Sequence, residues 1–294
     1  MGRIKHESCP NCDSQTLNEC FKGTDYSHTG EAFTVVSCND CSFTFTQDAP
    51  DQNSIGKYYE SDDYVSHSDT QKGLFYSMYH LVRKYMLGQK RKMIEKSSTK
   101  GKLLDIGCGT GYFLNEMKEH SWHCEGIEQD EKTREYGVNK FKLDINAPSH
   151  LASIPNASLQ VVSMWHVLEH VHNLGEQIQQ IHKALDAKGT LVVAVPNRDS
   201  YDAKKYKKYW AAWDLPIHLW HFTPDTMAKV MAKNGFKVVK HHRLPFDSFY
   251  VSILSEKYKV GSSFKGILIG GISFLKCLFN VKKCSSVVYI LKKT

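Results

Sequence analysis

The stretch Lys102-Leu103-Leu104-Asp105-Ile106-Gly107-Cys108-Gly109-Thr110-Gly111-Tyr112-Phe113-Leu114 decides the fold. A short apolar segment ends in an acid, three glycines follow on alternate positions, and an apolar pattern then resumes. Glycine tolerates positive φ and lets another molecule approach the backbone where a Cβ would block it. We therefore predict a strand over 102–106, a ligand-binding turn, and a helix over 112–120.

The spacing of these glycines narrows the choice of ligand. Folds that bind a dinucleotide through its pyrophosphate carry GxGxxG, whereas this chain carries GxGxG behind Asp105. S-adenosylmethionine has no phosphate to place at a helix N-terminus. The spacing therefore favours this cofactor over a nicotinamide.

Strand-like and helix-like segments alternate from Lys102 onward. We expect strands at 102–106, 123–128, 140–145, 159–165, 189–195, 237–243 and 286–291. Helices are expected near 112–120, 131–137 and 173–186. The alternation predicts an α/β fold, with a doubly wound, mostly parallel sheet of seven strands covered on both faces.

Polar groups follow several of these strands. Ligands of such sheets bind beyond the carboxyl ends of the strands, near the switch point of the strand order. Glu128 lies about 20 residues beyond the glycines, where an acid can accept hydrogen bonds from ribose hydroxyls. Asp144 at the end of the third strand can meet an adenine amino group, and Trp165 and His166 end the fourth.

These residues resemble the motifs of the class I S-adenosylmethionine-dependent methyltransferases, from residue 102 to about 243. LLDIGCGTG resembles the first motif, GIEQD the acid after the second strand, VVSMWHVLEHV the segment after the fourth, and LDAKGTLVVAVPN the fifth strand. The subfamily resembled contains small-molecule methyltransferases, including O-methyltransferases of quinone biosynthesis.

The resemblance implies a cofactor site. The glycines would pass beneath the cofactor, Glu128 would bind ribose, Asp144 would lie near adenine, and Trp165 with His166 would border the methionine portion. The cofactor-binding residues expected are Asp105, Gly107, Cys108, Gly109, Gly111, Tyr112, Glu128, Gln129, Asp144, Ile145, Trp165 and His166.

A separate module is expected over residues 1–46. Cys9-Pro-Asn-Cys12 and Cys38-Asn-Asp-Cys41 are two CxxC pairs with 25 residues between them. Four thiolates at this spacing can surround Zn²⁺ and fold a unit too small for its own core. We predict a zinc-ribbon-like module with a closed, structural zinc held by Cys9, Cys12, Cys38 and Cys41.

Residues 47–100 are expected to form a helical cover or linker, and residues 101–294 the methyltransferase domain. Apolar residues recur at helical spacing between Lys72 and Lys96. Tyr58, Tyr59 and Tyr64 either close over the ligands or pack the module against the main domain.

Histidines supply the candidate catalytic groups. If the acceptor is a hydroxyl, a general base is useful, and imidazole has a suitable intrinsic pKa. The dense cluster WDLPIHLWHFTP contains His218 and His221, and His166 lies nearest the end of the fourth strand. Any of these three is a candidate base, and His218 is preferred, whereas His170 is expected to be structural.

Composition and charge bound the remaining possibilities. The chain has 294 residues, a formal net charge of +7 and nine cysteines. Without an apolar leader or a run long enough to span a bilayer, we expect a cytoplasmic protein with reduced cysteines. A helical insertion at about 247–285 is apolar and fringed by lysines, so it suits a membrane surface, a lipid, a partner copy or burial.

Three functions remain open. The leading one is methyl transfer to a small-molecule acceptor at a hydroxyl oxygen, for example on a sugar or a quinone precursor. The second is RNA methylation with the zinc module holding RNA. Acids in the module and the absence of a [DNS]PP[YF] signature count against it. A non-catalytic binding protein is disfavoured by the intact glycine loop and acids.

Overall fold

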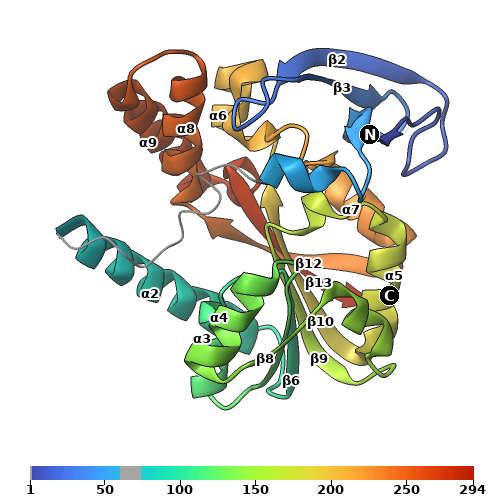
Figure 1. The fold of residues 1–294 in the computed structure, drawn as a ribbon, viewed down its shortest axis with the longest axis vertical. Helices are drawn as coiled ribbons and strands as arrows, with labels where there is room; N and C mark the ends of the chain where they lie inside the picture. Colours follow the sequence, from blue (N-terminus) through green and yellow to red (C-terminus); the bar gives the residue numbers. More distant parts are fainter. Residues whose placement is uncertain (1, 60–73) are drawn as a thin grey trace.

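The computed structural model describes residues 2–59 and 74–294, and a seven-stranded sheet lies at its centre (Figure 1). The strand order is β12-β13-β10-β9-β6-β7-β8. β13 runs antiparallel to β10 and β12, and the other pairs of neighbours are parallel. The predicted fold class is confirmed. The strands are β6 (Lys102–Ile106), β7 (His123–Ile127), β8 (Asp144–Asn146), β9 (Leu159–Trp165), β10 (Leu185–Pro196), β12 (Phe236–Leu244) and β13 (Ser286–Lys293).

Helices cover both faces of this sheet. In Figure 1, α2, α3 and α4 lie on one side of it, and α5 and α7 lie on the other. The helices are α2 (Leu74–Glu95), α3 (Tyr112–Glu119), α4 (Glu131–Phe141), α5 (Leu174–Ala184), α6 (Tyr201–Tyr206), α7 (Pro224–Lys233), α8 (Asp247–Tyr258) and α9 (Ser263–Phe279). Shorter 3₁₀ segments are η1 (Ile55–Tyr59), η2 (Pro148–Ser153), η3 (Leu168–His170), η4 (Lys207–Tyr209), η5 (Ala211–Trp213) and η6 (Val281–Lys283).

Alternation along the strands divides the core into two layers. Leu104 and Val162 pack with the helices α5 and α7, whereas their neighbours Leu103 and Val161 pack with α3. This follows from the period of two along a strand. Side chains fill both layers of the core. A polar ligand can therefore bind only at the ends of the strands.

Two expectations need correction. The third strand was expected at 140–145, but α4 continues to Phe141, where Lys142 ends it in the left-handed conformation, and β8 spans Asp144–Asn146. Cysteines were expected to be reduced throughout, yet Cys277 and Cys284 form a disulfide between the end of α9 and the residues before β13.

The N-terminal residues form a second, antiparallel sheet of order β11-β4-β3-β2. Its strands are β2 (Leu17–Thr24), β3 (Ala32–Cys38), β4 (Thr44–Gln47) and β11 (Trp220–His221), and β1 (Arg3–Ile4) pairs separately with β5 (Ala49–Pro50). Trp220 pairs with Phe45 and His221 with Thr44. This sheet therefore includes residues of the later chain, and the division at residues 46 and 100 stays a prediction.

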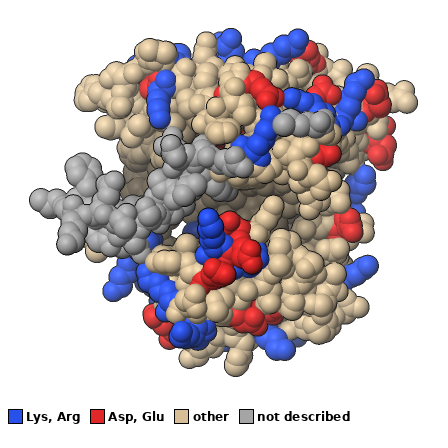
Figure 2. Space-filling model, viewed as in Figure 1, with Lys and Arg blue, Asp and Glu red and all other residues tan. Residues whose placement is uncertain are grey.

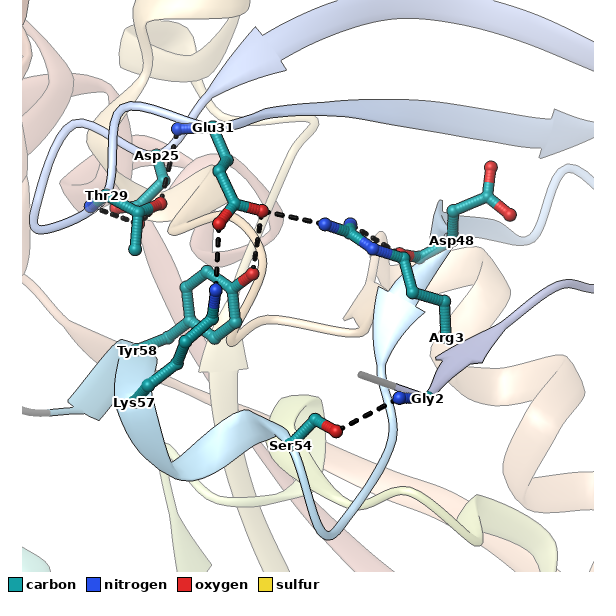
Figure 3. Close-up of polar contacts among 9 residues, drawn as sticks. All are labelled: Gly2, Arg3, Asp25, Thr29, Glu31, Asp48, Ser54, Lys57 and Tyr58. Atoms are coloured by element: carbon teal, nitrogen blue, oxygen red, sulfur yellow. Dashed lines mark hydrogen bonds and ion pairs between the residues drawn. The ribbon is translucent and has the colours of Figure 1, made fainter.

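A polar cluster around the carboxylate of Glu31 fixes η1, the segment that follows this sheet (Figure 3). Glu31 accepts hydrogen bonds from Lys57 at 2.8 Å, Tyr58 at 2.9 Å and Arg3 at 2.7 Å. These donors lower the pKa of Glu31 to about 2. Tyr58 is buried against Phe33, which supports its packing role. Tyr64 lies outside the described residues.

We expect Glu31→Gln to lower the free energy of unfolding at neutral pH by about 0.5–1 kcal/mol, since both ion pairs are partly exposed. A carboxylate whose folded pKa is depressed stabilises above its unfolded pKa of about 4.3 and loses that contribution as pH falls toward about 2. Urea unfolding across this range should show the difference shrinking, with Glu19→Gln on exposed β2 as control. An equal difference at both ends of the range would contradict this assignment.

Candidate functional site

The glycine loop lies between β6 and α3. Gly107, Gly109 and Gly111 have φ values of +69°, +53° and +81°. A Cβ on Gly107 would lie 2.3 Å from Val167, and one on Gly111 would lie 2.6 Å from Leu143. A Cβ on Gly109 would meet nothing within 4 Å. Gly107 and Gly111 are therefore required by packing, and Gly109 leaves open space for a ligand.

Glu128 holds this loop in place. Its Oε2 accepts the amide of Gly109 at 2.8 Å, and its Oε1 accepts the amides of Gln129 at 2.8 Å and Asp130 at 3.1 Å. A carboxylate offers about four acceptor positions, so one remains for a ligand hydroxyl. The predicted ribose-binding acid thus also fixes the backbone beneath the ligand.

Asp105 joins the first and fourth strands. Its Oδ1 accepts the hydroxyl of Ser163 on β9 at 2.6 Å, and the side chain is buried. Burial raises the pKa of Asp105 to about 7, against the lowering effects of Ser163 and Lys90. Asp105 therefore ties β6, which leads into the glycine loop, to β9, and it does so away from solvent.

The other predicted cofactor residues fall into two groups. The Cys108 thiol packs beside Gly126, and Ile145 is buried behind the loop. Gln129 and Asp144 are exposed, and Asp144 begins β8, so Asn146 and not Asp144 stands at the carboxyl end of that strand.

Tyr112 links α2 to the start of α3. Its hydroxyl accepts Lys140 at 2.7 Å, and the guanidinium of Arg83 on α2 lies 3.9 Å from its ring centroid. α2 thus contacts the residue directly after the glycine loop.

The fourth strand ends at a charged corner. His166 follows β9 with φ +58°, and its amide donates to Ala194 at 2.9 Å. Its Nδ1 lies 3.4 Å from Glu169, and its Nε2 lies 3.2 Å from Asp247 at the start of α8. Desolvation lowers the pKa of His166, but Asp247 and Glu169 together raise it to about 10.

His166 is therefore protonated at neutral pH. The side chain of His166 is 38% exposed, so its charge can reach a ligand. A protonated imidazole cannot accept a proton, and the geometry therefore favours an electrostatic role for His166 over that of a base.

Trp165 and Lys90 form the wall beside this corner. Lys90 Nζ of α2 lies 4.1 Å from the centroid of Trp165, whose ring also contacts Phe113 edge to face. Burial lowers the pKa of Lys90. Among the described residues, the indole N–H of Trp165 is buried without a hydrogen-bond partner. An orphaned donor and an ammonium group suit an anionic or polar ligand at this point.

His218 and His170 form a neutral pair close to Glu169. Their ring centroids are 4.6 Å apart, edge to face. His218 Nδ1 lies 3.0 Å from the carbonyl of Ala212, which can only accept, so we assign the proton to Nδ1 and leave Nε2 as an acceptor. His170 Nδ1 lies 3.1 Å from both the Ile217 carbonyl and the Tyr59 hydroxyl.

Burial keeps both rings uncharged. It lowers the pKa of His218, and together with His218 it lowers the pKa of His170 to about 4. The His218 ring is 8% exposed, and its Nε2 lies 3.8 Å from Asp214.

His221 is placed differently. It is 3% exposed, its Nε2 lies 3.0 Å from the hydroxyl of Thr46, and its ring abuts Trp213 at 4.8 Å. Burial holds its pKa well below the usual value. Nε2 thus links β11 to Thr46 of β4 and the ring packs on Trp213, which favours a structural role.

Two groups of side chains have metal-ligand chemistry in the described part of the chain. The sulfurs of Cys9 and Cys41, and those of Cys12 and Cys38, are 3.6 Å apart. A zinc–sulfur bond of about 2.3 Å gives a tetrahedron with edges of roughly 3.8 Å, so the four cysteines fit zinc. Glu169, His170 and His218 also offer ligand atoms within 4.8 Å of one another.

Sequence reasoning missed three members of this site: Lys90, Glu169 and Asp247. Each lies on an element whose position depends on tertiary packing. Lys90 is one of many helical lysines, and Asp247 belongs to the insertion. Glu169 within LEH was the one with a local signal, since it is an acid between two candidate histidines.

Comparisons with known proteins agree with this architecture. A family model described as "Methyltransferase domain" matches residues 78–241. A ubiquinone biosynthesis O-methyltransferase from Pelagibacter ubique is 27% identical over 174 residues, which cover 54% of this chain and 69% of that protein. A probable S-adenosylmethionine-dependent methyltransferase from Mycolicibacterium smegmatis is 24% identical over 142 residues.

That match covers 46% of this chain and 52% of the mycobacterial protein, so the chain spans about half the length of this relative. A solved S-adenosylmethionine-dependent methyltransferase from Archaeoglobus fulgidus has the same fold, with a TM-score of 0.51 and 22% identity over 72% of this chain and 94% of that one. The family model covers more than half of the chain, and the sheet has the expected order. The chain therefore belongs to the class I S-adenosylmethionine-dependent methyltransferases.

Proposed function

We propose that this protein transfers a methyl group from S-adenosylmethionine to a hydroxyl oxygen of a small-molecule acceptor, with His218 as the general base. The observation that carries the proposal is the His218 ring, whose Nδ1 faces the Ala212 carbonyl and leaves Nε2 as the proton acceptor, next to Glu169 and the charged corner after β9. The Pelagibacter relative is named an O-methyltransferase, which supports oxygen as the acceptor atom.

The chain's own residues divide the work. When bound, the cofactor supplies a methyl group that its sulfonium has already activated, so the protein mainly supplies position and a dry site. Gly109 and Glu128 would hold the adenosine, and the corner of Trp165 and His166 would hold the methionine portion. Lys90 and the indole N–H of Trp165 would offer donors to a carboxylate there.

His218 would handle the proton. Its Nε2 accepts the proton of the acceptor hydroxyl as the oxygen becomes a nucleophile. The buried carboxylate of Glu169 lies between His166, 3.4 Å away, and His218. A charge there stabilises the imidazolium once it forms, because Coulomb interactions are strong away from water.

The zinc module would serve this site as a structural support. We propose that Cys9, Cys12, Cys38 and Cys41 hold Zn²⁺, which fixes β4 through its neighbours. β4 in turn holds the segment that carries His218, because Thr46 donates to the His218 carbonyl at 2.7 Å.

For the cofactor, we expect Gly109→Ala to weaken S-adenosylmethionine binding at least about tenfold, or roughly 1.4 kcal/mol. Gly30→Ala is a matched control, since Gly30 has φ +70° and equally open space around it. Each alanine should cost about 1 kcal/mol of stability, because both glycines have positive φ. Calorimetric titration with S-adenosylmethionine separates the loss of affinity from the loss of stability. Equal affinity in both variants would remove Gly109 from the cofactor site.

For the base, we expect His218→Asn to lower turnover by about 10²-fold or more while cofactor affinity stays nearly unchanged. His221→Asn should lower thermal stability and leave the turnover of the folded enzyme within a few-fold. Because burial lowers the pKa of His218, wild-type kcat/KM should already be on its plateau at neutral pH and fall only in acid.

The assay uses a metabolite extract as the source of acceptors, with total RNA as a parallel substrate. A normal rate in His218→Asn would exclude this residue as the base. Salt-sensitive methylation of RNA would replace the small-molecule proposal by the RNA alternative.

For the metal, we expect about one zinc per chain, lost in the double variant Cys38→Ser/Cys41→Ser and kept in Cys20→Ser. Cys20 is exposed and lies outside the group of four. Loss of zinc should lower the melting temperature and reduce turnover more than cofactor affinity, since β4 supports the acceptor side. Zinc retained in the double variant would place the ion elsewhere, for instance at Glu169, His170 and His218.

A further inference from the structure

Helix α9 is amphipathic in an unusual sense, since its small residues face inward and its large apolar residues face outward. Gly266, Ile269, Gly270, Ser273 and Cys277 are buried. The outward residues, here named the α9 apolar face, are Phe264, Ile267, Leu268, Ile272, Leu275, Leu278 and Phe279. They range from 42% exposed at Ile272 to 91% at Phe279, an arrangement that water alone disfavours.

Close packing fixes this orientation of α9. A Cβ on Gly266 would lie 2.7 Å from Ile253 Cα, and one on Gly270 would lie 2.9 Å from Phe249 Cα. α9 therefore contacts the backbone of α8 directly, and no larger residue could replace these glycines on the inner side.

A buried carboxylate fixes the same orientation independently. Asp202 of α6 accepts Ser273 of α9 at 2.6 Å, and it also accepts Trp210 and Ser285 at 2.7 Å each. Turning α9 to bury its large residues would remove Ser273, the donor to Asp202 Oδ1, and losing a hydrogen bond to a buried carboxylate is costly inside a protein. The outward apolar face is thus a stable feature of the fold.

The charged residues around this face are mostly lysines. No Asp or Glu occurs from Lys257 to Thr294, whereas this segment contains eight lysines. Two of them are balanced by acids of other segments, Lys265 by Glu256 and Lys283 by Asp199. Lys276 and Lys282 pair with no carboxylate in the part of the chain that the structure describes. Figure 2 shows the lobe of α8 and α9, at its upper left, mostly without charged groups.

A basic depression adjoins the C-terminal end of the face. It has a volume of about 440 Å³ and is lined by Lys204, Lys276, Lys283, Asp199 and Phe279 among others. Lysines therefore gather where the apolar face ends, as the flanks of an interfacial helix do when lipid head groups are anionic.

We propose that the α9 apolar face docks the protein onto an anionic membrane surface, with Lys276 and the depression beside it facing the head groups. α9 has 17 residues and would lie in the plane of the interface over about 26 Å. Within the described residues, no helix is long and apolar enough to cross a bilayer. A second copy of the chain suits the face less well, because a symmetric contact would bring its lysines together.

The test measures sedimentation of the full-length protein with vesicles. Vesicles of phosphatidylcholine alone are compared with vesicles that also contain phosphatidylglycerol, each at low and high salt. We expect binding to the anionic vesicles that weakens as salt rises. Failure to bind them, or equal binding to both kinds, would overturn the proposal.

Two variants with similarly exposed residues complete the test. Leu268 and Leu275 are 53% and 55% exposed on the face, and Val239 on β12 is 52% exposed elsewhere. Leu268→Glu/Leu275→Glu should reduce vesicle binding at least about tenfold, since two apolar side chains lose their burial, whereas Val239→Glu should not. Cofactor affinity and the circular dichroism melt should stay unchanged and show that both variants fold.

Two further outcomes count against the membrane. Undiminished vesicle binding by the Leu268→Glu/Leu275→Glu variant would place the contact on another surface. Sedimentation velocity that shows a wild-type dimer, dissociated by this variant, would assign the face to a second copy of the chain.

Discussion

Pairing between β11 and β4 is the contact on which the proposed acceptor side depends. Two residues, Trp220 and His221, join a sheet that otherwise belongs to the N-terminal chain, and Thr46 holds both His218 and His221. The cofactor side needs no such help, because its loop is held by Glu128 and Asp105 within the large sheet. The two halves of the site thus have separate supports, and only the acceptor half relies on the cysteine-rich module.

Buried carboxylates decide what each histidine can do. Glu169 and Asp247 flank His166 and keep it protonated, so it cannot take a further proton. His218 lies farther from these acids, and burial keeps it neutral. One imidazole is therefore held protonated and the other neutral, although both begin with the same intrinsic pKa. This difference supports the proposal that His218 is the base in methylation of a hydroxyl.

The sequence predicted the large sheet well because each strand and helix carried its own periodicity. The strand ends were close for most strands. The exceptions are β8, because α4 continues to Phe141, and β10, which begins at Leu185 inside the helix predicted at 173–186. The signal for the four cysteines was equally local, because two CxxC pairs can be recognised without knowing the tertiary structure. Asp247 and Lys90 could not be found this way. Each reaches the corner from an element far away in the chain, and only packing brings them to His166 and Trp165.

The small residues on α9 show a second limit of prediction from hydrophobic periodicity. Apolar residues recur around this helix, so periodicity alone left burial, lipid and a partner copy equally open. The close approach of Gly266 and Gly270 to α8 decides which side is inside. We accordingly propose two surfaces that meet other molecules, the strand-end site and the outer side of α9.

A crystal structure of the complex with S-adenosylhomocysteine tests the central claim most directly, because it locates both ends of the donor site. The account predicts adenosine against Gly109, ribose hydroxyls within about 3.2 Å of Glu128, and the sulfur facing His218. Adenosine bound away from Gly109, or a sulfur turned from His218, would contradict it.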